Sequence, residues 1–162
     1  MRQGYALPVL TTTVIAEWVD YNGHMNDAAY AVVFSRSIDA LMDRIGLDVG
    51  ARKRSGQTLF TMQTMLHYFK EAKEGETLAV SARLIEHDDK RMRVWLEMAD
   101  GAGERLAASE QLLLSVALGD GGARATPWTH ETRAALDALQ KLHAAMPQPA
   151  DAGAGVGMNR PG

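Results

Sequence analysis

The sequence predicts an α+β fold in which an antiparallel sheet packs against one long helix, with an additional helix near the C-terminus. Three observations carry this prediction. An apolar stripe with helical spacing runs through residues 26–45. Four segments with the alternation of β-strands follow it, and short turn sequences separate them. Connections this short join consecutive strands as antiparallel hairpins.

The first predicted elements are a strand and the long helix. Residues 11–19 (TTTVIAEWV) are rich in β-branched side chains and alternate, as a strand does. Either Asn26 or Asp27 is a good N-cap for the helix, and Gly46 is a candidate C-cap. The apolar stripe consists of Tyr30, Val33, Phe34, Ile38, Leu41, Met42 and Ile45, and the polar face carries Arg36, Asp39, Asp43 and Arg44. A helix with this stripe packs on a sheet.

The rest of the sheet and a second helix are predicted downstream. The four strands are expected at residues 58–69, 77–87, 91–98 and 105–118. The second helix follows Pro127, with Thr129 as its N-cap, and it ends before Pro147. We expect residues 1–146 to form the domain and the Ala/Gly/Pro-rich residues 147–162 to be disordered.

Composition and charge exclude several classes of protein. The chain has 162 residues, of which 46% are hydrophobic and 23% are charged, as is typical of one globular domain. Its formal charge of −3 provides no basic footprint for a nucleic-acid partner. The absence of cysteine excludes disulfides and thiolate metal sites, and we expect no metal site.

The sequence also shows no membrane or export signal. The N-terminus has no basic segment followed by an apolar core, and no run approaches the roughly 20 apolar residues that a membrane span needs. We therefore expect a cytoplasmic protein without a membrane partner.

The segment directly before the long helix concentrates chemically active side chains. Asp20, Asn22 and His24 alternate along it, so in an extended segment they point the same way. The helix start behind them adds free backbone N–H groups and the positive end of a dipole. Together these groups suit a carbonyl or acyl substrate. The simpler alternative is that Asp20 caps a turn and Asn22 satisfies backbone groups.

This segment resembles motifs of hotdog-fold thioesterases. The pattern Asp20-x-Asn22-x-His24 resembles the D-x-N-x-H motif of plant acyl-ACP thioesterases. A wider pattern resembles bacterial acyl-CoA thioesterases of the 4-hydroxybenzoyl-CoA type and consists of Trp18, Asp20, Gly23, His24, Asn26, Tyr30 and Phe34. Residues 58–80 and the D-Y-N-G-H-M-N segment are similar to the betainyl-CoA thioesterases of carnitine catabolism. The resemblance implies a hotdog fold and an enzyme that hydrolyses a small acyl-CoA, with betainyl-CoA cleaved to glycine betaine and CoA.

The resemblance implies that Asp20 is the catalytic carboxylate. Asp20 either attacks the thioester carbonyl and forms a mixed anhydride, or it deprotonates a water molecule. Asn22 would orient water or Asp20, and His24 would position the loop or the substrate carbonyl. The thioester oxygen would be held by backbone N–H groups of Asn26, Asp27 and Ala28. No cofactor is expected, since coenzyme A is part of the substrate.

Further residues are candidates for binding the two ends of an acyl-CoA. Aromatic rings could enclose a trimethylammonium group, and we expect an acyl pocket of Trp18, Tyr21 and Tyr68. The alternative for these rings is core and dimer packing. Basic side chains could bind the CoA phosphates, and the candidates are Arg52, Lys53, Arg54, Lys70 and Lys73. The alternative for these is an ordinary solvated surface.

The sequence is also compatible with two other functions, and it predicts an oligomer. R-specific enoyl-CoA hydratases of the same fold use a D-x-N-P-x-H motif, which is one residue longer than the motif here. A non-catalytic acyl-CoA-binding module is the other alternative. We expect a homodimer or tetramer with sites at the subunit interface, because the edge strands of the sheet need covering.

Overall fold

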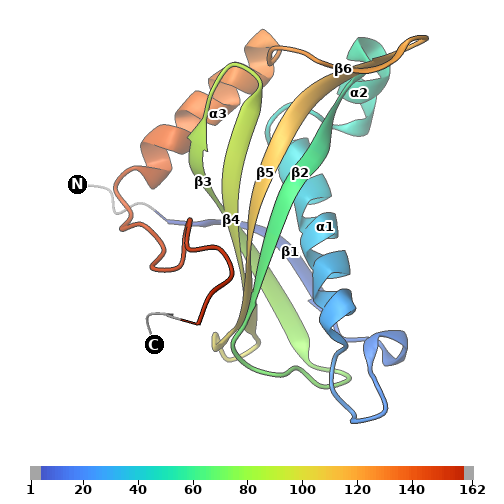
Figure 1. The fold of residues 1–162 in the computed structure, drawn as a ribbon, viewed down its shortest axis with the longest axis vertical. Coiled ribbons are helices and arrows are strands. Elements are labelled where there is room, and N and C mark those ends of the chain that lie inside the picture. The colour runs from blue at the N-terminus through green and yellow to red at the C-terminus, as the bar shows by residue number, and fades with distance from the viewer. Residues whose placement is uncertain (1–4, 159–162) are drawn as a thin grey trace.

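A computed structural model describes residues 5–158, in which one antiparallel sheet packs against helix α1 (Asp27–Arg44) (Figure 1). The six strands are β1 (Leu7–Thr13), β2 (Gln57–Tyr68), β3 (Thr77–His87), β4 (Arg91–Asp100), β5 (Arg105–Gly119) and β6 (Gly122–Ala125). The order across the sheet is β1-β3-β4-β5-β2, and β6 pairs with β5. Helix α3 (His130–His143) packs on β3. This arrangement is the hotdog fold, with an additional C-terminal helix, that the sequence predicts.

The first strand differs from its prediction. The segment expected to be extended over residues 11–19 is a strand only as far as Thr13, and Ala16–Trp18 form a 3-10 turn, η1. The strand ends where its partner does, because Thr13 pairs with Thr77, the first residue of β3. Strand β1 also begins earlier than expected and contains Pro8, which an edge strand tolerates.

Two short elements were not expected from the sequence. Helix α2 (Val49–Ser55) buries no side chain and therefore has no apolar stripe that could reveal it. It is defined by its ends, since the Asp48 side chain accepts a hydrogen bond from the Ala51 N–H and Gly56 adopts a left-handed conformation with φ 68°. Strand β6 has only four residues, all exposed.

The apolar stripe of α1 forms the centre of the core, as predicted. All seven side chains of the stripe are buried, and Val33, Phe34 and Ile45 are completely inaccessible. They pack in one cluster with side chains from one face of the sheet, which include Leu78, Leu96 and Leu113. Burying a side chain of this size stabilises the fold by about 1.5–3 kcal/mol. The helix is thus fixed on the sheet, and its N-terminal end holds the preceding loop in place.

The C-terminal part of the described chain lies against the sheet. Thr129 caps α3 as predicted, by accepting a hydrogen bond from the Thr132 N–H at 3.2 Å. Arg83 donates hydrogen bonds to the carbonyl groups of Met146 and Pro147, and the Gly153 N–H donates to Glu110 at 2.8 Å. The domain boundary at residue 146 and the disorder of residues 147–162 stay predictions, and residues 159–162 lie outside the described chain. None of the helices in residues 5–158 has the length and apolar character of a membrane span.

Candidate active site

The loop between η1 and α1 is held closed by the backbone and by one oxygen of Asp20. The Asp20 N–H donates to the His24 carbonyl at 2.9 Å, and the Gly23 N–H donates to the Asp20 carbonyl at 3.0 Å. Asp20 Oδ1 accepts from the N–H groups of Asn22 at 2.8 Å and His24 at 3.4 Å. Within residues 5–158 its other oxygen, Oδ2, accepts no hydrogen bond. The turn-capping role is therefore carried by Oδ1, and Oδ2 is left for chemistry.

Asn22 and His24 occupy different environments in this loop. The Asn22 side chain is exposed, and its backbone N–H is bound to Asp20. His24 is half-buried, and its Nε2 lies 3.2 Å from Glu71 Oε2. An isolated β-bridge between His24 and Lys73 joins the loop to the segment after β2. Glu71 was not predicted from the sequence, because nothing in its local pattern marks it as the partner of a residue 47 positions earlier.

The start of α1 leaves one of the three predicted backbone donors open. The Asn26 N–H donates to the Trp18 carbonyl at 2.7 Å. The Ala28 N–H donates to Asn26 Oδ1 and Asp27 Oδ1, both at 2.9 Å. In the described part of the chain, the Asp27 N–H has no acceptor. A carbonyl oxygen placed at this helix end would therefore meet the Asp27 N–H and the positive end of the helix dipole.

The predicted acyl-pocket aromatics separate into two groups. Tyr68 lies at the start of α1, where its hydroxyl donates to the Asp27 carbonyl at 3.1 Å and its ring meets Tyr30 edge-on at 5.3 Å. Trp18 is buried beside the loop, and the Arg36 guanidinium lies 5.4 Å from the centre of its ring. Tyr21 is 97% exposed, so one copy of the chain does not enclose it in a pocket.

The two tyrosines at the helix start remain protonated. Burial raises the pKa values of both Tyr68 and Tyr30 above the ordinary value of a tyrosine. The Tyr30 hydroxyl also accepts a hydrogen bond from the Ala72 N–H at 3.1 Å. Tyr30 thereby connects the helix to the segment that carries Lys70, Glu71 and Lys73.

The predicted CoA-binding cations lie at opposite ends of the molecule. Lys70 pairs with Glu104 at 2.5 Å, which raises the pKa of the lysine, and Lys73 lies beside His24 through the β-bridge. Arg52, Lys53 and Arg54 belong to α2, which is at the top of Figure 1, whereas the Asp20 loop is at the bottom. One copy of the chain therefore does not bring the α2 cations to Asp20.

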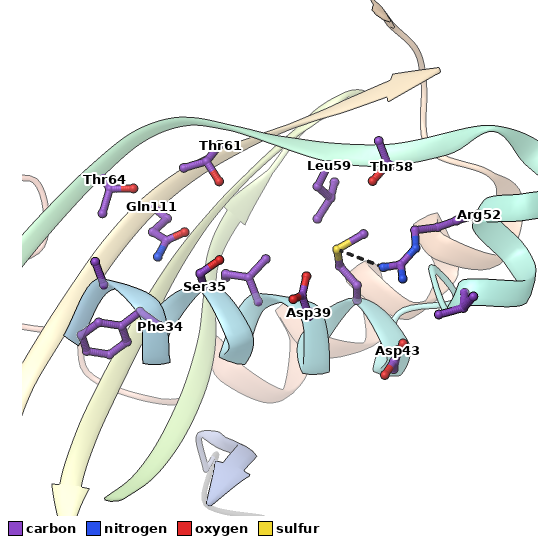
Figure 2. A pocket seen from close by; sticks show the side chains of 14 residues that line it. Phe34, Ser35, Asp39, Asp43, Arg52, Thr58, Leu59, Thr61, Thr64 and Gln111 are labelled. Carbon is purple, nitrogen blue, oxygen red and sulfur yellow. Dashed lines mark hydrogen bonds between the residues drawn. The ribbon is translucent and has the colours of Figure 1, made fainter. Parts of the chain in front are cut away.

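A second feature is a cavity of about 720 Å³ between α1 and β2. Figure 2 shows its walls, which include Ser35 and Asp39 of α1, Arg52 of α2, Thr58 and Thr61 of β2, and Gln111 of β5. The sequence marked Asp39 only as part of the polar face of the helix. The recurrence of Ser35, Asp39 and Asp43 at every fourth position could have indicated a polar stripe along one side of α1.

Comparison with known sequences connects this site to thioester chemistry. The sequence profile described as Thioesterase-like superfamily matches residues 14–136. A betainyl-CoA thioesterase of Pseudomonas aeruginosa is 43% identical over 153 residues, which cover 94% of this chain and 95% of that protein. An L-carnitine dehydrogenase/betainyl-CoA thioesterase of Rhizobium meliloti is 35% identical over 155 residues, which cover 95% of this chain and 31% of that longer protein.

Comparison with solved structures points the same way. A putative thioesterase from Pseudomonas putida KT2440 is 36% identical, with a TM-score of 0.80 over 98% of this chain and 99% of that chain. A hypothetical protein from Staphylococcus aureus, solved in complex with CoA, has a TM-score of 0.87 over the same shares and is 21% identical. At that identity the second likeness concerns the fold alone.

Proposed function

We propose that this chain, which belongs to the thioesterase-like superfamily and is an acyl-CoA thioester hydrolase, cleaves betainyl-CoA to glycine betaine and CoA. The observation that carries the choice of acyl group is the 43% identity to a betainyl-CoA thioesterase over nearly the whole of both chains. No feature of the site favours the enoyl-CoA hydratase or the binding module over hydrolysis.

In the proposed reaction, Asp20 supplies the attacking oxygen directly or through water. Its Oδ2 has no hydrogen-bond partner in the described residues, while Oδ1 keeps the loop in shape. Direct attack would give a mixed anhydride and release CoA as the thiolate, and water would then cleave the anhydride. In the general-base route, Asp20 would deprotonate a water molecule that adds to the carbonyl carbon. The resulting intermediate would expel CoA as the thiolate and leave the free acid. Both routes use the same Asp20 oxygen.

The start of α1 would stabilise the negative charge on the thioester oxygen. The Asp27 N–H is the donor available for this, because the N–H groups of Asn26 and Ala28 already have acceptors. A preorganised donor of this kind lowers the barrier by roughly 3–4 kcal/mol. Asn22 would orient the attacking water, and His24, held by Glu71, would fix the loop that carries Asp20.

We assign the CoA phosphates to basic residues from two copies of the chain. Strand β2 is an edge of the sheet, and five consecutive residues in its middle, 60–64, are exposed. A second copy can pair with this edge antiparallel about a twofold axis, which makes the contact the same on both copies. An axis at the middle of β2 places Tyr68 opposite Gln57 of the other copy, next to that copy's α2. Lys70 and Lys73 of one copy would then share a site with Arg52, Lys53 and Arg54 of the other.

The experiment that tests the proposal measures free CoA thiol released from a panel of acyl-CoAs. The panel contains betainyl-, acetyl-, hexanoyl-, palmitoyl- and 4-hydroxybenzoyl-CoA. We expect the highest kcat/KM with betainyl-CoA and a loss of about 10²- to 10⁴-fold in the Asp20→Asn variant, which keeps an oxygen at the capping position but has no charge. A thermal melting curve checks that this variant folds.

Two outcomes would count against the proposal. A maximum at another acyl group would remove betainyl-CoA as the substrate. Near-normal turnover by Asp20→Asn would remove Asp20 from the chemistry. Hydration of crotonyl-CoA, followed by its loss of absorbance, serves as the test for the alternative reaction. A cytoplasmic location stays a prediction.

A further inference from the structure

Asp39 is a carboxylate without a partner in the wall of the α1–β2 cavity. In Figure 2 its side chain points from α1 toward β2, whereas Asp43, one turn further along the helix, points away from the strand. Within residues 5–158, Asp39 takes part in no ion pair. Arg52, which also lines the cavity, directs its Nη1 to Met42 Sδ at 3.7 Å. The cavity therefore presents a negative charge that the chain itself does not neutralise.

The rest of the wall offers a cation both apolar surface and neutral oxygen atoms. Leu59 and Met42 supply apolar surface, and Ser35, Thr61 and the buried Gln111 supply oxygen atoms. A trimethylammonium group is stabilised by a nearby negative charge and by apolar or aromatic contact, and it does not need a hydrogen-bond acceptor. The acyl group of the proposed substrate ends in this group.

Asp39 is too far along α1 to meet the acyl group cleaved by Asp20 of the same copy. Twelve residues separate it from Asp27 at the helix start, which corresponds to about 18 Å along the axis. The betainyl nitrogen lies only two single bonds from the carbonyl carbon, or roughly 2.5 Å. One copy of the chain therefore cannot use Asp20 and Asp39 on the same molecule of substrate.

Pairing of two copies through β2 brings the two ends of the helix together. Within one copy α1 and β2 run in opposite directions, since Tyr68 bonds to Asp27 at one end and Thr58 shares the cavity with Asp39 at the other. A twofold axis through the middle of β2 exchanges these ends. The start of α1 in one copy then faces the Asp39 half of the cavity in the other.

We propose that Asp39 of one copy binds the trimethylammonium group of the acyl chain whose thioester is cleaved at Asp20 of the other copy. Tyr68 of the catalytic copy, which is 44% exposed beside the start of α1, offers an aromatic face to the same cation. Asp39 is thus a residue that determines specificity. The inference rests on the proposed function, because it takes betainyl-CoA as the substrate.

The test compares two acyl groups of equal shape that differ in charge. In 3,3-dimethylbutanoyl-CoA a carbon atom replaces the nitrogen of betainyl-CoA. We expect Asp39→Asn to lower kcat/KM for betainyl-CoA by about tenfold or more. The same variant should hydrolyse the neutral substrate within about twofold of the wild-type rate, which also shows that it is folded. Glu131→Gln, which removes an equal charge from an exposed position of α3 outside the cavity, should leave both values unchanged.

Mixed dimers test whether Asp39 acts across the interface. Asp20→Asn and Asp39→Asn chains are co-expressed with different affinity tags, and doubly tagged dimers are isolated. Each such dimer contains one complete site, formed by Asp20 of one chain and Asp39 of the other. Its rate on betainyl-CoA should therefore return to about half of the wild-type value per dimer. A rate no higher than that of Asp39→Asn alone would overturn the arrangement.

Failure of this inference is distinguishable from failure of the proposed function. If the wild-type protein does not prefer betainyl-CoA to the neutral substrate, the choice of substrate is wrong, and the role of Asp39 falls with it. If the wild type has this preference and Asp39→Asn retains it, the substrate stands and the assignment of Asp39 is wrong.

Discussion

Gly23 allows the Asp20 loop to turn back on itself. Its φ of 79° lies in the left-handed region, where a side chain is strained, and a Cβ added there would meet no atom within 4 Å. The turn lets Asp20 Oδ1 accept two backbone N–H groups while Oδ2 stays free. Glycine is thus required here because of the backbone conformation, and not because room for a side chain is lacking.

The Gly23→Ala variant separates backbone strain from packing. We expect it to lose about 1–2 kcal/mol of unfolding free energy, measured by urea denaturation, and to lower kcat because Asp20 shifts. Gly119→Ala is the matched control, since Gly119 also has open space around its Cβ position but no left-handed φ. Equal stability of both variants would show that the loop relaxes without strain.

At the scale of elements, α3 is attached to the sheet through a neutral histidine. His143 is 2% exposed, and its Nδ1 accepts a hydrogen bond from the Leu84 N–H of β3 at 2.9 Å. Burial, together with the nearby Arg83, lowers the pKa of His143 below its ordinary value. Protonation would remove the acceptor and place a second positive charge next to Arg83.

This attachment predicts that the protein loses stability in mild acid. The pKa of His143 is lower in the folded than in the unfolded protein, so its contribution is complete above about pH 6.5 and is lost as the pH falls below that value. Denaturation curves between pH 5 and 8 measure the effect.

His143→Leu identifies the residue responsible. It should cost about 1–3 kcal/mol at neutral pH, because the Leu84 N–H loses its acceptor, and it should flatten the pH dependence. His130→Gln, which changes an exposed histidine on the same helix, should keep the wild-type profile. An unchanged slope in His143→Leu would place the pH dependence elsewhere.

In the molecule as a whole, the candidate site lies at the start of α1. The basic residues of α2 that we assign to the CoA phosphates lie near the other end of that helix. The sheet has two edges, β1 and β2, and β2 carries the exposed apolar side chains Phe60 and Met62. A long edge strand of this kind is normally covered by another chain. The proposed dimer covers it and completes the site in the same step.

A charge on this edge should therefore disrupt both assembly and activity. We expect Met62→Lys to sediment as a monomer and to lose most of its activity, because the proposed register places the lysine opposite Gln63 of the other copy and diagonal to that copy's own lysine. Thr11→Lys places the same charge on an exposed position of the other edge, β1, and should leave both properties unchanged. A Met62→Lys protein that stays dimeric and active would exclude β2 as the interface.

The sequence predicts some features of the fold and the candidate site better than others. Periodicity located α1, which buries a regular stripe, and the turn sequences between alternating segments located β2 to β5. The Asp20 motif lies at the helix start as expected. The end of β1 depends on where β3 begins, and α2 depends on its caps, so neither leaves a periodic signal. The roles of Glu71 and Asp39 depend on contacts between distant segments, and of the predicted aromatics only the structure separates exposed Tyr21 from Tyr68.

Recognition of the cation is measured by the ratio of kcat/KM for betainyl-CoA to that for 3,3-dimethylbutanoyl-CoA in the wild-type protein. Shape and thioester chemistry are the same in both substrates, so the ratio reports recognition of the cation alone. We expect a ratio of about ten or more, which corresponds to a contribution of about 1.4 kcal/mol from the charge contact. A ratio of one or below would contradict this expectation.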